Sequence, residues 1–204
     1  MIVDNVQNNI SVGVSNNLVF IKVEGKGTFQ ISQPLRQLSM EMIGRGYREF
    51  IVDLADCPSM DSTFLGVLAG MCLRLQNLTV ADAKAAGTSA PGIGAAKVHL
   101  ANLNARCHDV LRALGIDRLF CLDVCELRIG GQTAALPGRA SLQPLQQQPS
   151  AAAASRENQA EVMLEAHRTL MEIEPQNIPK FKDVVRFLSE DIEKLRTSGE
   201  PTVS

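Results

Sequence analysis

The stretch from Phe50 to Leu75 constrains the fold of this chain most, because its hydrophobic period changes partway along. The run from Phe50 to Leu54 is short, apolar and rich in β-branched residues, which is typical of a buried strand. From about Thr63 the apolar residues fall on one helical face instead. They are Leu65, Leu68, Ala69, Cys72 and Leu75. The stretch therefore predicts a strand, a turn and a helix.

Two polar residues, Asp61 and Ser62, lie at the junction between the turn and the helix. Either side chain can cap the helix by accepting a hydrogen bond from its free N–H groups. A hydroxyl at this place is exposed, and it lies where a helix N-terminus favours negative charge. On spacing alone, Ser62 is a helix cap.

The segment Met60 to Leu68 (MDSTFLGVL) resembles the signature of the STAS domain of bacterial anti-sigma factor antagonists. In that family the segment reads Asp-Ser-Ser/Thr-Gly-Leu-Gly after a strand, and a partner kinase phosphorylates the first Ser. Five residues match and one, Phe64, departs, because the family usually has Gly there. The matching residues are Asp61, Ser62, Thr63, Leu65 and Gly66. The resemblance covers roughly Ile10 to Leu127.

The resemblance implies a phosphorylation-switched binding module of the bacterial cytoplasm and not an enzyme. The dephosphorylated form would bind an anti-sigma factor with serine kinase activity, release its sigma factor and so regulate transcription. Phosphorylation of Ser62 would end the binding, and a PP2C-type phosphatase would restore it. The implied partner-binding residues are Asp61, Ser62, Thr63, Phe64, Leu65 and Gly66. We expect the Phe64 ring to face outward or to cover the edge of this surface, with a core position as the alternative.

Two other functions stay open. The first is a scaffold or assembly subunit that does not switch and that oligomerises through its C-terminal helices; Phe64 favours it slightly, because a large apolar residue beside Ser62 could alter access for a kinase. The second, a small-ligand binder or an enzyme that uses the crevice at the strand ends, lacks a motif.

The composition of the chain bounds its class. Its 204 residues suffice for one domain and an appendage, and aromatic residues make up only 4%, so the core must be aliphatic. A net charge of −2 argues against nucleic-acid binding, and no apolar run has the length of a membrane span. The 5 cysteines form no CxxC pair, which indicates reduced core thiols and not a zinc site. We expect a soluble, cytosolic protein.

Strand and helix signals alternate along residues 1–129. A hairpin is predicted over Ile10 to Val23, and a helix is predicted to open near Ser32 with Pro34 in its first turn. After the central stretch follow a strand, a helix and a last strand. They are Lys97 to Ala101, the helix that Asn104 caps and Gly115 stops, and Leu119 to Leu122. The order predicts an α/β, STAS-like domain with a mixed, mostly parallel sheet covered by helices.

The last third of the chain has a different composition. Residues 130–155 are rich in Gln, Ala, Pro and Ser, which predicts a disordered linker. Residues 156–197 predict a helical hairpin with two apolar stripes, and 198–204 a tail. The stripes are Met163, Leu164, His167, Leu170 and Met171, then Phe181, Val184, Val185, Leu188, Ile192 and Leu195. Two helices cannot easily form a core alone, so they must pack on the STAS-like domain, on a second copy in a homo-oligomer, or on another protein.

The remaining candidates for chemistry have simpler explanations. The carboxylates of Asp53, Asp56 and Asp61 could bind a metal, but turn formation and capping are the preferred interpretation. The 3 histidines, His99, His108 and His167, have no second ligand at helical spacing. Residues 87–94 (GTSAPGIG) lack the Lys and hydroxyl that a phosphate-binding loop needs. We therefore expect no catalytic residue, metal site or cofactor.

Overall fold

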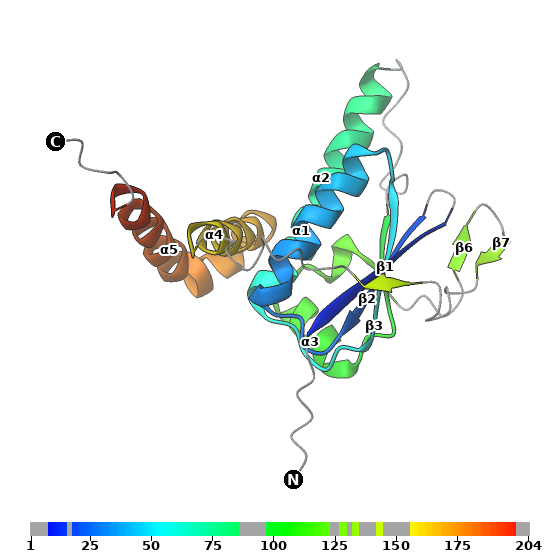
Figure 1. Cartoon of the computed structure of the whole chain (residues 1–204), viewed down its shortest axis with the longest axis horizontal. Coiled ribbons are helices and arrows are strands. Elements are labelled where there is room, and N and C mark those ends of the chain that lie inside the picture. The colour runs from blue at the N-terminus through cyan, green and yellow to red at the C-terminus, as the bar shows by residue number, and fades with distance from the viewer. Residues whose placement is uncertain are drawn as a thin grey trace, which may run out of the picture.

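The computed structural model describes residues 8–15, 18–85, 97–122, 127–129, 132–134, 142–144 and 156–198. Its centre is a mixed sheet of 6 strands in the order β5-β4-β3-β2-β1-β8 (Figure 1). The strands are β1 (Asn9–Ser15), β2 (Leu18–Glu24), β3 (Glu49–Asp56), β4 (Lys97–Ala101), β5 (Cys121–Leu122) and β8 (Gln143–Pro144). The pairs from β2 to β5 are parallel, whereas β1 is antiparallel to both neighbours. The predicted mixed, mostly parallel sheet is confirmed.

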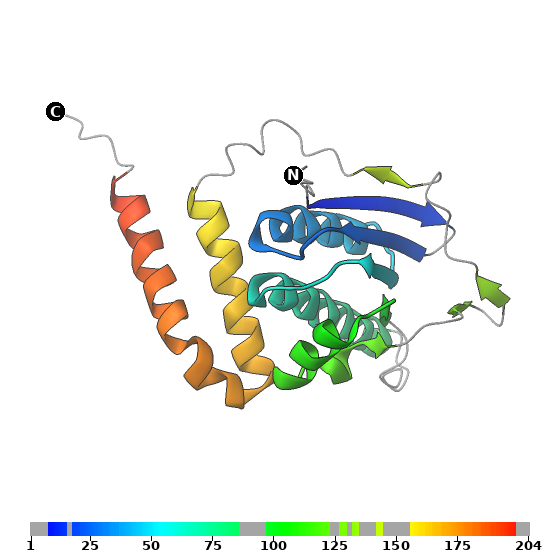
Figure 2. The ribbon, with the colours of Figure 1, turned by 90° about the horizontal axis from the view of Figure 1, so that it is seen from below.

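Helices α1 (Phe29–Gly44) and α2 (Ser62–Ala85) lie side by side on one face of this sheet (Figure 2). Alternate strand residues point toward them, and the main core fills the space between. The strand residues of this core include Val19, Ile21, Val23, Phe50, Val52, Leu54, Val98 and Leu100. Helix α3 (Ala105–Ala113) and the 3-10 turn η1 (Asp117–Leu119) connect β4 to β5.

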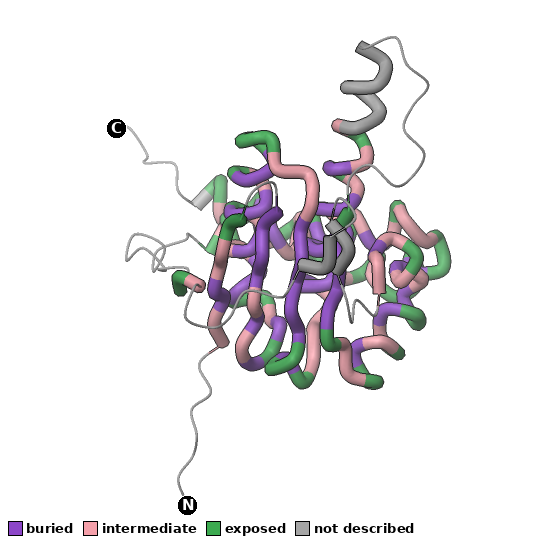
Figure 3. The backbone as a smooth tube through the Cα atoms, turned by 90° about the vertical axis from the view of Figure 1, so that its right-hand side faces the viewer, coloured by how far each residue is buried: buried purple, intermediate pink, exposed green. Residues whose placement is uncertain are grey.

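The other face of the sheet carries a smaller apolar cluster, and the strands that form it are largely buried (Figure 3). Its members are Leu18, Phe20, Ile51 and Ala101, with Leu142 packed against them. Leu142 directly precedes β8, which pairs with the edge strand β1 through Ser11 and Val12. A segment from late in the chain thus adds the sixth strand.

Part of the region expected to be a disordered linker forms strands. Within 130–155, β7 (Gln132–Ala134) pairs with β6 (Leu127–Ile129), and β8 extends the main sheet. Residues 130–131, 135–141 and 145–155 lie outside the described residues, as do the loop 87–94, Cys125 and 199–204.

The predicted start of α1 is wrong. The helix begins at Phe29, so Pro34 lies inside it and not in its first turn. Ser32 does not cap the helix, because its hydroxyl donates to the Thr28 carbonyl within the first turn, at 2.9 Å. Asn104 and Gly115, by contrast, act as predicted: Asn104 Oδ1 accepts from the Cys107 N–H at 2.9 Å, and Gly115 adopts a φ of 65° after α3.

The predicted helical hairpin is present and packs on α2 and α1. It consists of α4 (Arg156–Ile173), the 3-10 turn η4 (Pro175–Asn177) and α5 (Ile178–Ser198), and α4 crosses the N-terminal ends of α1 and α2 (Figure 2). The predicted first stripe is partly wrong, since Met163, Leu164 and Met171 are only half-buried. The buried side chains of α4 are Ala160, Val162, Ala166, His167 and Leu170. None of the helices in the described residues is long and apolar enough to cross a membrane.

Candidate functional site at the start of α2

The loop that leads from β3 into α2 is held by the loop that follows β2. The N–H of Gly27 donates to the Ser59 carbonyl at 2.9 Å, and the N–H of Asp61 donates to the Gly27 carbonyl at 2.8 Å. Gly27 and Met60 form an isolated parallel bridge. These bonds continue the parallel pairing of β2 and β3 beyond the strand ends, and they fix where α2 begins.

The carboxylate of Asp61 joins the first turns of two helices. Its Oδ1 accepts from the N–H of Phe64 in α2, and its Oδ2 accepts from the N–H of Phe29 in α1, both at 2.8 Å. The positive end of each helix dipole favours this negative charge. Of the two predicted candidates, Asp61 is the cap of α2 and also positions α1, whereas the interpretation of Ser62 as a helix cap is wrong because its hydroxyl contacts His167.

The hydroxyl of Ser62 contacts the C-terminal hairpin. Its Oγ lies 2.9 Å from Nε2 of His167, and Nδ1 of His167 lies 2.7 Å from the Met163 carbonyl. Because a carbonyl only accepts, Nδ1 carries a proton, and in the ring protonated at Nδ1 alone Nε2 accepts from the Ser62 hydroxyl. The ring of His167 is buried and packs against Phe181, with ring centroids 5.0 Å apart. Ser62 itself is only half-buried.

One turn further along α2, the backbone of α4 lies directly on Gly66. A Cβ at Gly66 would come within 2.4 Å of the Ala166 carbonyl oxygen, closer than real Cβ atoms approach. Gly70, a further turn along, faces the side chain of Thr169. The absence of a side chain at Gly66 lets the two helix backbones come together.

The middle residues of the predicted partner-binding segment are buried. Thr63, Phe64 and Leu65 are each 3% exposed or less. The expectation that the Phe64 ring faces outward is wrong: the ring packs between Gly27 and Met60, and a Cβ on Gly27 would lie 2.7 Å from its Cδ1. The absence of a side chain at Gly27 leaves room for the ring of Phe64.

The turn of the hairpin is held by the end of α3. The buried amide of Asn177 donates through Nδ2 to the carbonyls of Leu114, at 2.8 Å, and of Leu170, at 3.1 Å. Lys180 Nζ donates to the Ala113 carbonyl at 2.8 Å. Both contacts satisfy carbonyls that a helix end leaves free. The hairpin is thus attached at α3 as well as at α2.

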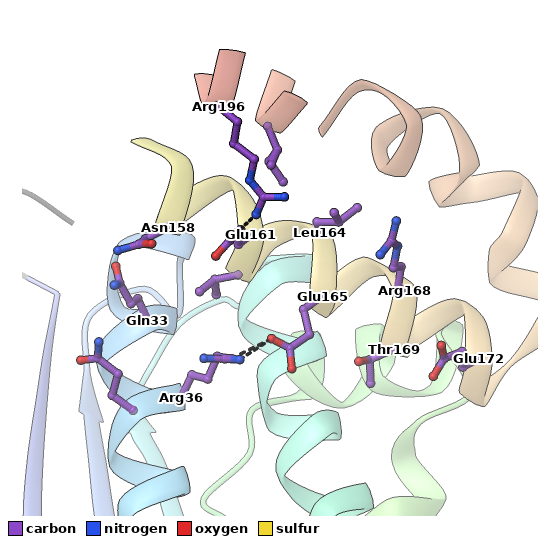
Figure 4. A pocket seen from close by; sticks show the side chains of 13 residues that line it. Gln33, Arg36, Asn158, Glu161, Leu164, Glu165, Arg168, Thr169, Glu172 and Arg196 are labelled. Carbon is purple, nitrogen blue, oxygen red and sulfur yellow. Dashed lines mark hydrogen bonds and ion pairs between the residues drawn. The ribbon is translucent and has the colours of Figure 1, made fainter. Parts of the chain in front are cut away.

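Charged side chains line an open cavity of about 770 Å³ between α1, α4 and α5 (Figure 4). Arg36 of α1 pairs with Glu165 of α4 at 2.7 Å, and Arg196 of α5 pairs with Glu161 of α4. The cavity carries both signs of charge, and these pairs connect the three helices that form it.

The three aspartates considered as metal ligands have separate partners. Asp53 Oδ1 accepts from the Asn102 amide at 2.7 Å, Asp56 pairs with Lys22 at 2.7 Å, and Asp61 caps the two helices. Within the described ranges, no three His, Cys, Asp or Glu side chains come together as a metal site would require. Capping accounts for the contacts of Asp61, whereas Asp53 and Asp56 bind residues of neighbouring segments, Asn102 and Lys22.

Two thiols meet beside the loop that precedes α2. Cys57 and Cys107 are both buried and unoxidised. A hydrogen bond from the Cys107 thiol is the main cause that lowers the pKa of Cys57 to about 7; backbone hydrogen bonds at Gly27 and Ser59 act in the same direction, and burial opposes them. The same contact raises the pKa of Cys107. The burial of Cys57, Cys72 and Cys107 agrees with the predicted core cysteines, while the contact between Cys57 and Cys107 is a feature that the sequence did not reveal.

The sequence did not predict that one of the three histidines, His167, contacts Ser62. His99 is buried with Nε2 3.1 Å from Glu49, and His108 lies half-buried on α3. His167 was placed in an apolar stripe and treated as core, yet it contacts Ser62 from more than 100 residues away. The available signal was a polar ring in an otherwise apolar stripe, since a buried polar group needs a partner.

No family model matches the sequence, and no curated protein matches it. Similar solved structures include TM1081 of Thermotoga maritima, assigned as an anti-sigma factor antagonist, at 16% identity over 56% of this chain and 85% of that one, with a TM-score of 0.43. The unphosphorylated anti-sigma factor antagonist SpoIIAA is similar at 17% identity over 50% and 81%, with a TM-score of 0.40. Phosphorylated SpoIIAA of Bacillus is similar at 16% over 55% and 89%, with a TM-score of 0.42. The segment Asp61 to Gly66 resembles this same class of protein.

Proposed function

We propose that the chain is an anti-sigma factor antagonist, a binding module that acts through the start of α2. Its partner is an anti-sigma factor with serine kinase activity, and binding releases a sigma factor for transcription in the bacterial cytoplasm. The observation that carries the proposal is the placement of Ser62, whose half-buried hydroxyl opens a helix that Asp61 caps. The matching motif residues around it support the proposal.

A phosphate on Ser62 would change this surface more than it would change the fold. It adds about −1.5 to −2 charges beside the free N–H groups of a helix start, where an anion is favourable. A partner packed over the same helix start would meet a dianion in place of a hydroxyl, at a cost on the order of several kcal/mol. A PP2C-type phosphatase would restore binding. In this proposal Ser62 and Gly66 face the partner, while Thr63, Phe64 and Leu65 support the surface from within.

The test is to isolate the tagged full chain from its native host, identify the proteins bound to it and map its phosphate by mass spectrometry. Ser62→Ala should abolish the phosphate and keep the partner. Ser62→Asp should recover at least tenfold less partner, which corresponds to about 1.4 kcal/mol. Thr63→Ala is the matched control, because this neighbouring hydroxyl is only 3% exposed and should not be a substrate. Phosphate mapped elsewhere, or equal recovery with Ser62→Asp, would overturn the proposal.

A scaffold that oligomerises through its C-terminal helices is the second candidate. It is favoured by two large apolar side chains of α5 that are exposed, Phe187 at 60% and Ile178 at 43%. Light scattering of the full chain decides: a scaffold should have the mass of an oligomer, should dissociate with Phe187→Ser, and should keep its mass with Ser62→Asp.

A further inference from the structure

The surface around Ser62 and Gly66 is not free, because α4 of the same chain lies on it. We infer that the α4–α5 hairpin is a resident cap on this surface, and that a partner or kinase reaches Ser62 only after the hairpin has undocked. The identity of the competing partner rests on the function proposed above, whereas the coverage of this surface by the hairpin does not. The hairpin would then keep the chain in a closed, non-binding state.

The α4–α5 hairpin lies outside the main layers of the fold. The sheet packs against α1 and α2, and α4 crosses the ends of these two helices as an additional layer (Figure 2). The contacts of Val52, Leu54 and Leu65 belong to the sheet and α2. The hairpin adds Val162, Ala166 and Leu170 to this core from outside the sheet, α1 and α2. The strands, α1 and α2 also pack on one another, so they keep contacts of their own when the hairpin is undocked.

Several contacts between the hairpin and the rest of the chain are polar. Ser62 bonds to His167, Arg36 pairs with Glu165, and Asn177 binds the Leu114 carbonyl. Water can replace these contacts when the hairpin leaves, so their net contribution to docking is smaller than that of an equal apolar area. Contacts of this mixed composition suit reversible docking of the hairpin better than a continuous apolar core would.

The surface of α2 that the hairpin covers is shaped to receive a helix. Gly66 admits a helix backbone at close range, with Ala166 at the crossing point, and Gly70 faces Thr169 one turn further along. Arg36 lies beside this track and binds an acidic side chain, here Glu165 (Figure 4). The same chemistry describes the competing partner: an amphipathic helix with a small residue at the crossing point and an acidic residue next to it.

The experiment measures opening without any partner. The full chain carrying Ser62→Cys is labelled with N-ethylmaleimide, and each cysteine is quantified by peptide mass spectrometry. Ser15→Cys, at an exposed strand end, reports labelling of an uncovered thiol. The native buried thiols Cys72 and Cys107 report global unfolding. Asn177→Ala and, separately, Leu170→Ala weaken the hairpin at a distance from position 62.

We expect the thiol at position 62 to react at least tenfold more slowly than the one at position 15. Asn177→Ala or Leu170→Ala should accelerate labelling at 62 at least tenfold, while Cys72 and Cys107 stay protected. Arg186→Ala, on the exposed face of α5, is the matched control and should change nothing.

Three results would overturn the inference: equal rates at 62 and 15, acceleration at 62 and at both buried thiols by the same factor, or no acceleration with either hairpin variant. Since no kinase or partner is present, such a failure would be independent of whether phosphate is found on Ser62 in the host.

Discussion

Replacing Ser62 with alanine should destabilise the chain by more than the loss of a half-exposed hydroxyl would suggest. The group left behind is Nε2 of His167, which is bonded to Ser62 at 2.9 Å in a side chain that is 4% exposed. A buried acceptor without a partner costs about 1–3 kcal/mol. The reverse change, His167→Phe, frees the Ser62 hydroxyl to bond to water, and the new ring can still pack against Phe181. We expect His167→Phe to cost less than Ser62→Ala.

The double variant Ser62→Ala/His167→Phe removes both polar groups and leaves no buried acceptor. It should be more stable than the sum of the two single changes predicts, by about 1 kcal/mol. Urea denaturation of the four proteins, followed by far-ultraviolet circular dichroism, gives the free energies of unfolding. A loss below about 0.5 kcal/mol for Ser62→Ala, or additive changes in the double variant, would refute the reasoning, because an orphaned buried acceptor must produce both effects.

Three further predictions concern the residues that position this site. Phe64→Ala should lower the free energy of unfolding by about 3–5 kcal/mol, as expected of a buried ring. A loss under about 1 kcal/mol would contradict this and indicate that the ring lies at the surface. Asp61→Ala should cost about 1–4 kcal/mol in urea denaturation because two helix caps are lost, whereas Asp61→Asn should keep most of the stability. Because the native state lowers the pKa of Cys57 from 9.0 to about 7, it releases a proton that the unfolded chain still holds. The stability should therefore rise between pH 7 and 9, and Cys107→Ala should flatten this rise and move the thiolate absorbance of Cys57 to higher pH.

The local signals in the sequence predicted the centre of the fold well. The change of hydrophobic period near Thr63 placed β3 and α2. Residue type and position identified Asn104 as a cap and offered Asp61 and Ser62 as alternative caps of α2, of which Asp61 is the actual one. These features depend on interactions between residues a few positions apart, which a sequence displays directly. The parallel order of the strands followed from their alternation with helices.

Features that depend on distant residues were missed. The ring of Phe64 is buried because Gly27, on another loop, leaves space for it. The strand β8 forms in a segment of low hydrophobicity because the edge of β1 offers free backbone groups to pair with. The partner of Ser62 is His167, on a helix whose docking position no local pattern specifies. In each case a property of one segment is decided by the shape of another.

Gly66 links the resemblance in sequence to the inference from structure. In the sequence it was one of the matches to a motif, with no physical reason attached. In the structure it is the point at which a second helix backbone, at Ala166, comes too close to permit a Cβ. A glycine in the middle of a helix costs roughly 0.5–1 kcal/mol relative to alanine, so its presence in α2 needs a compensating contact. Here the compensating contact is α4. A partner that takes over the surface would have to make the same close approach, so both occupants need the residue that the motif retains.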